Sequence, residues 1–264
     1  MSKLAIIAGR GGLPAALVAA LSEAPMICAL DGFAPDGLLV DQLFRVERLA
    51  VFLRALEDAG VTRVCFAGAV QRPRLDPSLF DPQTAQMVPR LLAAMQAGDD
   101  ATLREVIAIF EESGFEVVGV ETITPALLPQ AGILAGAVTT ADEADAARAE
   151  EIVAALGAVD VGQGAVVARG LCLGVETLSG TNVMLAAVAA LPAELRGKGG
   201  LFYKAAKPAQ DRRMDLPTIG VETIRQAAAA GLAGVCIQAG SVICLDLAQV
   251  QAEAAAQGLF LWAR

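Results

Sequence analysis

Short apolar runs alternate with helix-like segments through the first 120 residues of this 264-residue chain. The helix-like segments repeat apolar residues at helical spacing, whereas each apolar run has the length of a buried strand. Alternation of this kind predicts a parallel sheet covered by helices, because parallel strands need crossover connections. The apolar runs span residues 3–9, 26–31 and 61–68, and the helix-like segments between them span residues 13–24 and 49–60.

A second α/β region follows an uncharged segment at residues 124–140. This segment contains two prolines and separates the regular alternation from a mixture of helical and strand patterns. Domain boundaries commonly fall in stretches of this composition. We therefore predict an N-terminal Rossmann-like parallel-sheet domain at residues 1–123, a linker at 124–140 and a smaller C-terminal mixed α/β domain at 141–264.

Hydrophobic residues make up 55% of the chain, so a membrane-spanning segment has to be considered. Residues 226–245 carry no charge and reach the length of a spanning helix. Gly231, Gly234 and Gly240 interrupt them, which fits the end of a helix followed by two short strands. We predict no transmembrane segment, and the glycine-rich turn near the N-terminus argues in the same way against a secretion signal.

Composition also excludes several classes of function. The formal net charge of −9 argues against nucleic-acid binding, which depends on many Lys and Arg residues. The chain contains no histidine, so Ser-His-Asp and Cys-His catalysis and His-ligated zinc are ruled out. The five cysteines lie in apolar stretches without a Cys-x-x-Cys pair, which indicates reduced core residues of a cytosolic protein.

A glycine-rich turn separates the first predicted strand from its helix. Backbone amides near Gly9, Gly11 and Gly12 could bind a phosphate at the start of that helix. Asp31 ends the second strand, where a dinucleotide-binding fold places its ribose-binding acid, but Pro14 replaces the third glycine of the fingerprint. Nucleotide or substrate contact and a tight turn without ligand both remain open.

Two further turns carry candidate residues. Gly68 and Arg72 follow the third predicted strand, at the carboxyl edge where open parallel sheets bind ligands. Gly98, Asp99 and Asp100 precede a predicted helix, where either aspartate could bind a ligand or simply cap the helix.

A cluster of positive charge interrupts the acidic chain between residues 196 and 213. Six of the 20 Lys and Arg residues fall there beside a single acid, Asp211, and the run ends at Asp215. Such cations can bind phosphate oxygens, and an acid beside them can stay ionised as a metal ligand or base. A solvated loop is the alternative. The cations are Arg196, Lys198, Lys204, Lys207, Arg212 and Arg213.

Polar side chains also follow the predicted strands of the second half. Asp160 and Gln163 lie in one glycine-containing turn, and Glu176, Thr181 and Asn182 lie in another. Each group could bind a ligand or could equally form a turn and a helix cap.

Taken together, these motifs resemble the I-type UDP-2,3-diacylglucosamine pyrophosphatase family of lipid A biosynthesis. The most specific motif is KAAKPAQDRRMDLPTIG at residues 204–220. The other matching motifs are AGRGGLP, FAGAVQRP, GDD, DVGQGAVV, VETLSGTNVML, AGLAGV and GLFLW, so the resemblance covers nearly the whole chain.

The resemblance implies two α/β domains joined by a linker, with the lipid nucleotide between them, in a homodimer. It implies Mg²⁺-dependent attack of water on the α-phosphorus of UDP-2,3-diacylglucosamine, which releases UMP and 2,3-diacylglucosamine 1-phosphate. Asp215 matches the essential aspartate of the family, which makes it the expected catalytic residue and metal ligand in the C-terminal loop. An acylated substrate also leads us to expect a cytoplasmic protein that is peripheral to the inner membrane.

The remaining candidate positions are expected to bind the substrate. They are Gly9, Gly11, Gly12, Gly68, Arg72, Gly98, Asp99, Asp100, Gln163, Glu176, Thr181, Asn182, Lys204, Lys207, Gln210, Arg213 and Thr218.

The sequence departs from the family at one motif. Ser179 and Asn182 stand where the family commonly has Glu and Asp, which reduces the local capacity to hold a divalent ion. Ala209 stands where many members have Gly. Two alternatives therefore stay open: a Rossmann-like nucleotide-binding protein or oxidoreductase, and a homologue that binds acylated sugar nucleotide without cleaving it.

Overall fold

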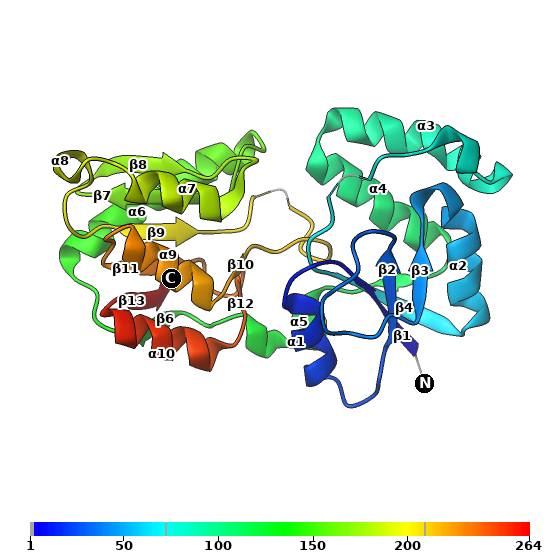
Figure 1. Cartoon of the computed structure of the whole chain (residues 1–264), viewed down its shortest axis with the longest axis horizontal. Helices are drawn as coiled ribbons and strands as arrows, with labels where there is room; N and C mark the ends of the chain where they lie inside the picture. Colours follow the sequence, from blue (N-terminus) through cyan, green and yellow to red (C-terminus); the bar gives the residue numbers. More distant parts are fainter. Residues whose placement is uncertain (1–2, 72, 209) are drawn as a thin grey trace. The chain divides into compact units, whose positions relative to one another are not determined.

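A computed structural model describes residues 3–71, 73–208 and 210–264 of the chain (Figure 1). The chain forms two compact units, and the division does not follow the sequence order completely. Unit 1 comprises Met1–Pro125 together with the short segment Asp211–Asp215, and unit 2 comprises Ala126–Gln210 and Leu216–Arg264.

The described residues of unit 1 form a five-stranded sheet with the order β3-β2-β1-β4-β5, and all four pairings are parallel. This confirms the predicted parallel sheet. The strands are β1 (Lys3–Ala8), β2 (Met26–Leu30), β3 (Gln42–Phe44), β4 (Val61–Ala67) and β5 (Glu116–Val117). The helices are α1 (Leu13–Ala20), α2 (Leu49–Asp58), α3 (Pro82–Ala97), α4 (Asp99–Glu112) and α5 (Val120–Ile123).

The core of unit 1 lies between this sheet and the helices α2, α3 and α4. Phe52 of α2 stacks on Phe44 with ring centroids 4.0 Å apart, and Phe110 of α4 contacts Phe52 edge-on. Fully burying one such side chain contributes about 1.5–3 kcal/mol to stability. Met214, from the segment Asp211–Asp215, packs against the same cluster, which explains why that segment belongs to unit 1.

Unit 2 contains a mixed sheet with the order β6-β13-β11-β9-β7-β8. Strands β9, β11 and β13 run parallel to one another, whereas β6, β7 and β8 pair in antiparallel fashion. The strands are β6 (Gly132–Ala135), β7 (Gly164–Ala168), β8 (Leu171–Val175), β9 (Leu201–Lys204), β11 (Gly234–Ile237) and β13 (Phe260–Ala263), and β10 (Thr218–Ile219) pairs separately with β12 (Ile243–Cys244). This confirms the predicted mixed α/β character.

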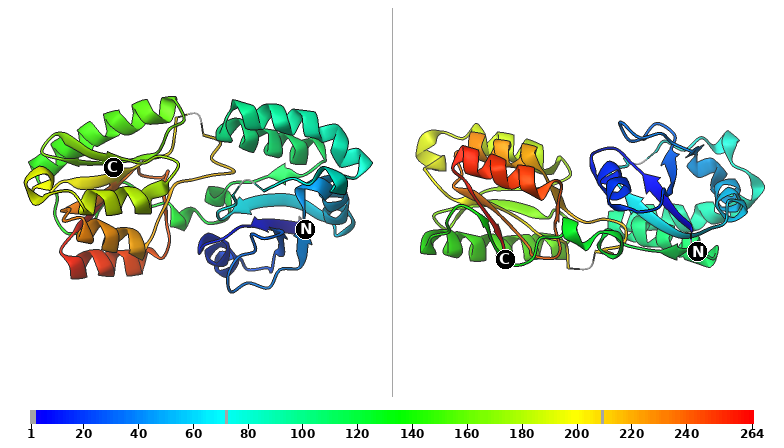
Figure 2. Two further views of the ribbon diagram at one scale, coloured as in Figure 1. Left: turned by 45° about the horizontal axis from the view of Figure 1, so that its top comes forward. Right: turned by 90° about the horizontal axis from the view of Figure 1, so that it is seen from below.

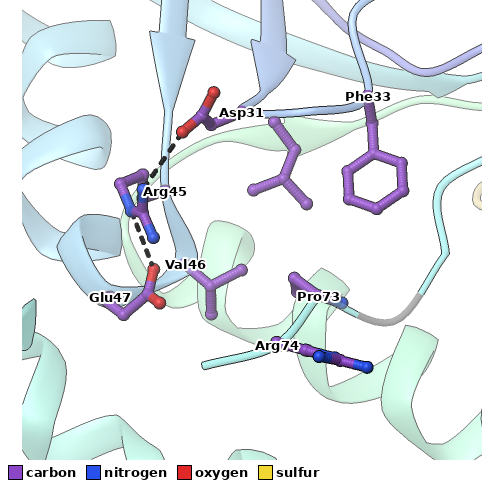
Figure 3. A pocket seen from close by; sticks show the side chains of 8 residues that line it. Asp31, Phe33, Arg45, Val46, Glu47, Pro73 and Arg74 are labelled. Carbon is purple, nitrogen blue, oxygen red and sulfur yellow. Dashed lines mark hydrogen bonds and ion pairs between the residues drawn. The ribbon is translucent and has the colours of Figure 1, made fainter. Parts of the chain in front are cut away.

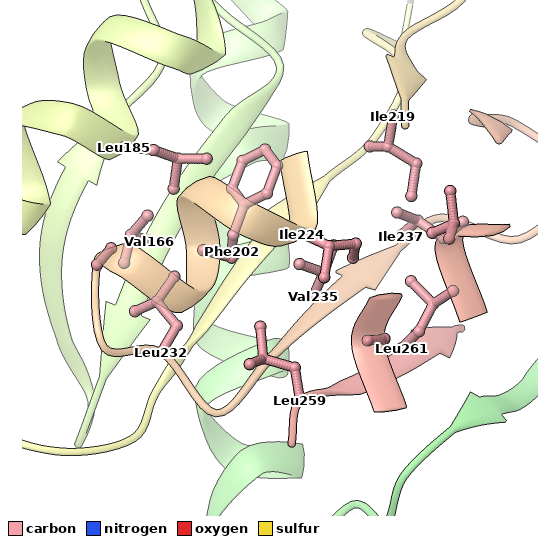
Figure 4. Close-up of a cluster of buried hydrophobic side chains, with 14 of the residues drawn as sticks. Val166, Leu185, Phe202, Ile219, Ile224, Leu232, Val235, Ile237, Leu259 and Leu261 are labelled. Carbon is pink, nitrogen blue, oxygen red and sulfur yellow. The ribbon is translucent and has the colours of Figure 1, made fainter. Parts of the chain in front are cut away.

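Helices cover both faces of the unit 2 sheet, as the views in Figure 2 show. Phe202 and its neighbours on one face meet Leu185 of α7 and Ile224 of α9 (Figure 4). Alternate residues such as Tyr203 point to the other face and meet Val153 of α6. The helices are α6 (Thr140–Ala158), α7 (Gly180–Ala189), α8 (Ala193–Arg196), α9 (Val221–Ala229) and α10 (Leu247–Gln257).

Several elements differ from the sequence-based expectation. The segment 124–140, interpreted as a linker, contains strand β6, which pairs with β13. Strand β7 begins at Gly164, after the turn that contains Asp160 and Gln163, and the sequence patterns did not predict β3 or α10. These elements are short or rich in alanine, so their hydrophobic periodicity is weak.

Residues 226–245 form the end of α9 followed by β11 and β12, as the glycine spacing predicted. Within the described ranges, no helix is long and apolar enough to cross a membrane. Four of the five cysteines are buried and free, and burial raises the pKa of the Cys28 thiol to about 12. The expectation of a core position was wrong for Cys172, which is exposed because β8 lies at the edge of its sheet.

We expect Phe202→Ala to lower the free energy of unfolding by about 3–5 kcal/mol, because the ring is fully buried in the unit 2 core. Leu178→Ala is the control, since this side chain is 95% exposed and its loss should change stability by less than about 0.5 kcal/mol. Urea unfolding followed by fluorescence of Trp262, which lies on β13, reports on unit 2 directly. Equal midpoints for the two variants would contradict the assignment of this core.

Candidate functional site

The two glycine turns at the carboxyl ends of β1 and β4 pack against each other. The amides of Gly9 and Arg10 donate to the carbonyl oxygens of Ala67 and Ala69 at 2.7 and 2.9 Å. A Cβ on Gly9 would lie 2.6 Å from the Ala69 oxygen, and one on Gly68 would lie 2.7 Å from the Gly9 oxygen. Close approach of two backbones therefore explains Gly9 and Gly68, and two amides of the first turn already have protein partners.

The rest of the first turn leads into α1. Gly11 has a φ of 96°, a conformation that side chains other than glycine rarely adopt, and Gly12 is the N-cap residue of the helix. The side chain of Arg10 extends to the end of β2, where it donates to the Gly32 carbonyl oxygen at 2.8 Å and lies over the Phe33 ring.

Asp99 and Asp100 occupy the first turn of α4, and Gly98 is the N-cap residue. The sequence left open whether one of these aspartates caps the helix. Neither does, because Gly98 occupies the N-cap position. Asp100 forms an ion pair with Arg104 at 2.6 Å through Oδ2, while its buried Oδ1 has no hydrogen-bond partner among the described residues. The positive end of the helix dipole favours both acids.

The segment Asp211–Asp215 is fixed to unit 1 by Arg213. Its guanidinium donates to both carboxylate oxygens of Asp211, at 3.0 and 2.7 Å, and to Oε1 of Glu111 on α4 at 2.6 Å. Hydrogen bonds from Arg213 lower the pKa of Asp211 against the opposing effect of partial burial, and the charge of Arg104 lowers it further. The side chain of Asp215 is exposed, and its amide faces the Asp211 carbonyl oxygen at 3.4 Å.

A second group of candidate residues forms a buried cluster in unit 2. Nζ of Lys204, at the end of β9, donates to the Thr181 hydroxyl at 2.7 Å, and that hydroxyl donates to Oε1 of Glu176 at 3.0 Å. Lys204 and Glu176 lie 3.5 Å apart and expose only 5% and 7% of their surfaces. Gly164 leaves room for this cluster, since a Cβ there would lie 2.5 Å from Oε2 of Glu176.

The loop after β9 contains a more exposed ion pair. Nζ of Lys207 donates to Oδ1 of Asp160 at 2.6 Å, and the Lys207 amide donates to the Gln210 side chain. The carbonyl oxygen of Gln163 accepts from the Ala205 amide, which places this turn beside the same loop.

The last two candidates of unit 2 lie apart from these contacts. Thr218 donates from its hydroxyl to the Leu216 carbonyl oxygen, and Asn182 is exposed in the first turn of α7. Ser179 is the N-cap residue of α7, so neither Thr181 nor Asn182 is the cap that the sequence suggested. The remaining candidate, Arg72, lies outside the described residues.

Four cations of the positive cluster at residues 196–213 have acidic partners. Lys204 and Lys207 belong to unit 2, whereas Arg212, which lies 3.9 Å from Glu121, and Arg213 belong to unit 1. Sequence reasoning identified the cations but missed Glu111 and Glu121. No local signal could have found them, because Glu111 is separated from Arg213 by 102 positions.

Comparison with known proteins agrees with the motifs read from the sequence. The model of the LpxI N-terminal domain matches residues 3–127, and the model of the LpxI C-terminal domain matches residues 130–262. The chain belongs to the LpxI family. It is similar to UDP-2,3-diacylglucosamine pyrophosphatase LpxI of Caulobacter vibrioides, with 40% identity over 99% of this chain and 97% of that protein.

Apart from two residues at the boundary near residue 126, the LpxI domain matches and the compact units disagree over one segment. Residues 211–215 lie inside the match to the LpxI C-terminal domain, but they fold with unit 1. The chain therefore passes between the units at three points, after Pro125, Gln210 and Asp215. Contacts with α4 and with the core of unit 1 therefore fix the position of the segment that contains Asp215, although its motif lies in the match to the LpxI C-terminal domain.

We expect Gly68→Ala to destabilise the protein more than Gly37→Ala does, by at least about 1 kcal/mol. Both glycines have positive φ, so each substitution carries about 1–2 kcal/mol of backbone strain. Only at Gly68 would the new methyl also displace the facing turn, since a Cβ on Gly37 meets nothing within 4 Å. Calorimetric unfolding of the two variants measures the difference, and equal losses would show that the turns do not depend on this contact.

Proposed function

We propose that this protein hydrolyses UDP-2,3-diacylglucosamine to UMP and 2,3-diacylglucosamine 1-phosphate in lipid A biosynthesis. The observation that carries the proposal is 40% identity over nearly the full length to a protein named for this activity, together with matches to both LpxI domain models. Incubation of the purified protein with the substrate and Mg²⁺, followed by ³¹P NMR, tests it. Release of UMP is the expected result, whereas intact bound substrate would indicate the non-cleaving homologue.

In the proposed reaction a water oxygen attacks the α-phosphorus, and the bond from that phosphorus to the bridging oxygen breaks. UMP leaves with the new oxygen, and the bridging oxygen stays on the lipid phosphate. Because the chain contains no histidine, a carboxylate is the natural group to orient the water and take up its proton. We assign this role to Asp215, whose side chain is exposed and which matches the essential aspartate of the family.

The residues fit a Mg²⁺ ion that is shared with the substrate. The described residues contain no group of three His, Cys, Asp or Glu side chains that could hold a metal by themselves. Mg²⁺ is usually bound through one or two carboxylates, water and substrate phosphates, so a single aspartate is a sufficient protein contribution. Asp215 would provide that carboxylate, and the ion would neutralise charge on the diphosphate.

The same proposal includes where the protein works and how it assembles. A substrate with two acyl chains resides in a membrane, so a cytoplasmic enzyme would meet it at the surface of the inner membrane. A homodimer is the assembly that the family resemblance implies. Carbonate and salt washing of membranes, and the mass of the purified protein in solution, test these two points.

We expect Asp215→Asn to reduce turnover at least about 10²-fold, the lower end of what a positioned acid-base group contributes. Substrate binding should persist, since removing a negative charge near the diphosphate relieves repulsion in the bound state. Asp36→Asn is the control, because Asp36 is another exposed acid of unit 1. Near wild-type UMP release by a folded Asp215→Asn protein would remove this residue from the mechanism.

Glu111 should act as a positioning residue, because it holds Arg213 and thereby the segment that carries Asp215. We expect Glu111→Gln to lower kcat about tenfold with little change in KM, since the reacting group is displaced while substrate contacts remain. Glu112→Gln is a closely matched control: the neighbouring residue forms its ion pair with Arg90, at 2.8 Å. Exposed pairs of this kind contribute about 0.2–1 kcal/mol, so both variants should fold equally well. Equal kcat values would show that the ion pair is structural only.

A further inference from the structure

Four exposed apolar side chains lie at one end of the unit 2 sheet. The start of β7 pairs with the end of β8, at Ala165 and Val175, so the turn before β7 and the turn between β8 and α7 are neighbours. Apolar residues scattered singly over a surface are ordinary, but a group of them marks a contact site. The group, which we call the apolar tip, consists of Val159, Val161, Leu178 and Val183, with exposed fractions of 70%, 42%, 95% and 55%.

Contacts inside unit 2 hold the backbone of the apolar tip. The Val161 amide donates to the Leu156 carbonyl oxygen of α6 at 3.0 Å, and the Gly180 amide donates to the Thr177 carbonyl oxygen at 2.9 Å. Gly162 packs so closely against the Glu176 carbonyl oxygen that no Cβ would fit there. The apolar side chains are therefore exposed on turns that are fixed to each other.

The turns of the apolar tip carry no net charge, although the whole chain has a formal net charge of −9. Residues 159–163 and 177–183 contain one charged residue, Asp160, and Nζ of Lys207 pairs with it at 2.6 Å. A membrane surface that contains anionic lipids repels an acidic protein. The neutral turns can approach such a surface at a smaller electrostatic cost than the acidic remainder of the chain.

Leu39 of unit 1 is almost as exposed as Leu178, at 91%, but its surroundings differ. It lies in the connection between β2 and β3, where charged side chains gather (Figure 3). Arg45 there lies 3.1 Å from Asp31 and 3.4 Å from Glu47. Charged groups are costly to remove from water, so an apolar layer does not suit this surface.

We propose that the apolar tip contacts the surface of a lipid bilayer, an inference that rests on the function proposed above. The proposed substrate has two acyl chains and therefore resides in a bilayer. Glu176, Thr181 and Lys204, which are expected to bind that substrate, lie at the same end of the sheet, since Lys204 pairs with the first residue of β7. Contact through the apolar tip brings these residues to the surface where the substrate is found.

The size of the apolar tip favours a bilayer over a second protein. A standard protein interface takes about 20–30 residues from each side, whereas the tip is formed by the short segments 159–163 and 177–183. A bilayer requires no complementary shape, and each apolar side chain that enters it contributes by its own buried area.

Co-sedimentation of the full chain with vesicles of phosphatidylcholine and phosphatidylglycerol tests the proposal. We expect the wild-type protein to bind these vesicles without substrate. Leu178→Ser should weaken binding about tenfold, because a leucine side chain no longer leaves water. Leu39→Ser is the matched control, and it should bind as the wild-type protein does, because Leu39 lies outside the apolar tip.

Asp160→Asn tests the effect of charge at the same surface. Loss of this carboxylate leaves Lys207 with an unpaired positive charge beside the tip, so binding to vesicles that contain phosphatidylglycerol should strengthen about fivefold. Binding to vesicles of phosphatidylcholine alone should not change, and high salt should remove the gain. Asp36→Asn, which removes an exposed acid of unit 1, is the control and should give a smaller gain.

The outcomes separate this inference from the hydrolytic function. The membrane contact is overturned if the wild-type protein stays in the supernatant, or if the Leu178→Ser and Leu39→Ser proteins bind alike. It is also overturned if Leu178→Ser converts a dimer into a monomer in solution, because a second copy then covers the tip. Hydrolysis is measured separately, on substrate dispersed in detergent. A protein that binds vesicles through the tip but releases no UMP in that assay retains the membrane contact and lacks the hydrolytic function.

Discussion

The arrangement of the candidate site depends on how five residues dock onto unit 1. Met214 packs into the apolar cluster of that unit, and Arg213 bridges Asp211 and Glu111 beside it. The apolar contact holds the segment, while the directional bonds of the guanidinium fix its orientation. Because the chain enters the segment after Gln210 and leaves it after Asp215, a motif encoded in the C-terminal half is built onto the N-terminal core.

Charge pairing across long sequence distances shapes both units. Within the described residues, four of the six cations between residues 196 and 213 meet acids from elsewhere in the chain, so a phosphate bound by one of these four would compete with a carboxylate already in place. Phosphate binding is least favourable at Lys204, because separating its buried ion pair with Glu176 would leave an uncompensated charge. Lys207 and Arg213 are more exposed, so an exchange of partners there involves less desolvation.

The sequence predicted the parts of the fold that depend on strong hydrophobic patterns. Strands β1, β2 and β4 are mostly buried, so their apolar runs stood out, whereas β3 and β6 are short and partly exposed. The site was less predictable, because its geometry rests on tertiary contacts. The sequence showed glycines at positions 9 and 68 but not that they face each other, and it showed Arg213 but not Glu111. Pairwise contacts of this kind follow from topology and leave no local pattern.

The proposed mechanism requires a fixed position for the group that activates water. Water attack on the α-phosphorus makes UMP the product that contains the reacting phosphorus, so the group that activates water and the groups that hold the nucleotide must keep a fixed relation. Asp215 belongs to unit 1, where Met214 packs into the core and Arg213 bonds to Glu111. Small displacements of reacting groups reduce rates strongly. Anchoring both the apolar side chain and the guanidinium beside Asp215 therefore restricts its movement more than a loop without such contacts would.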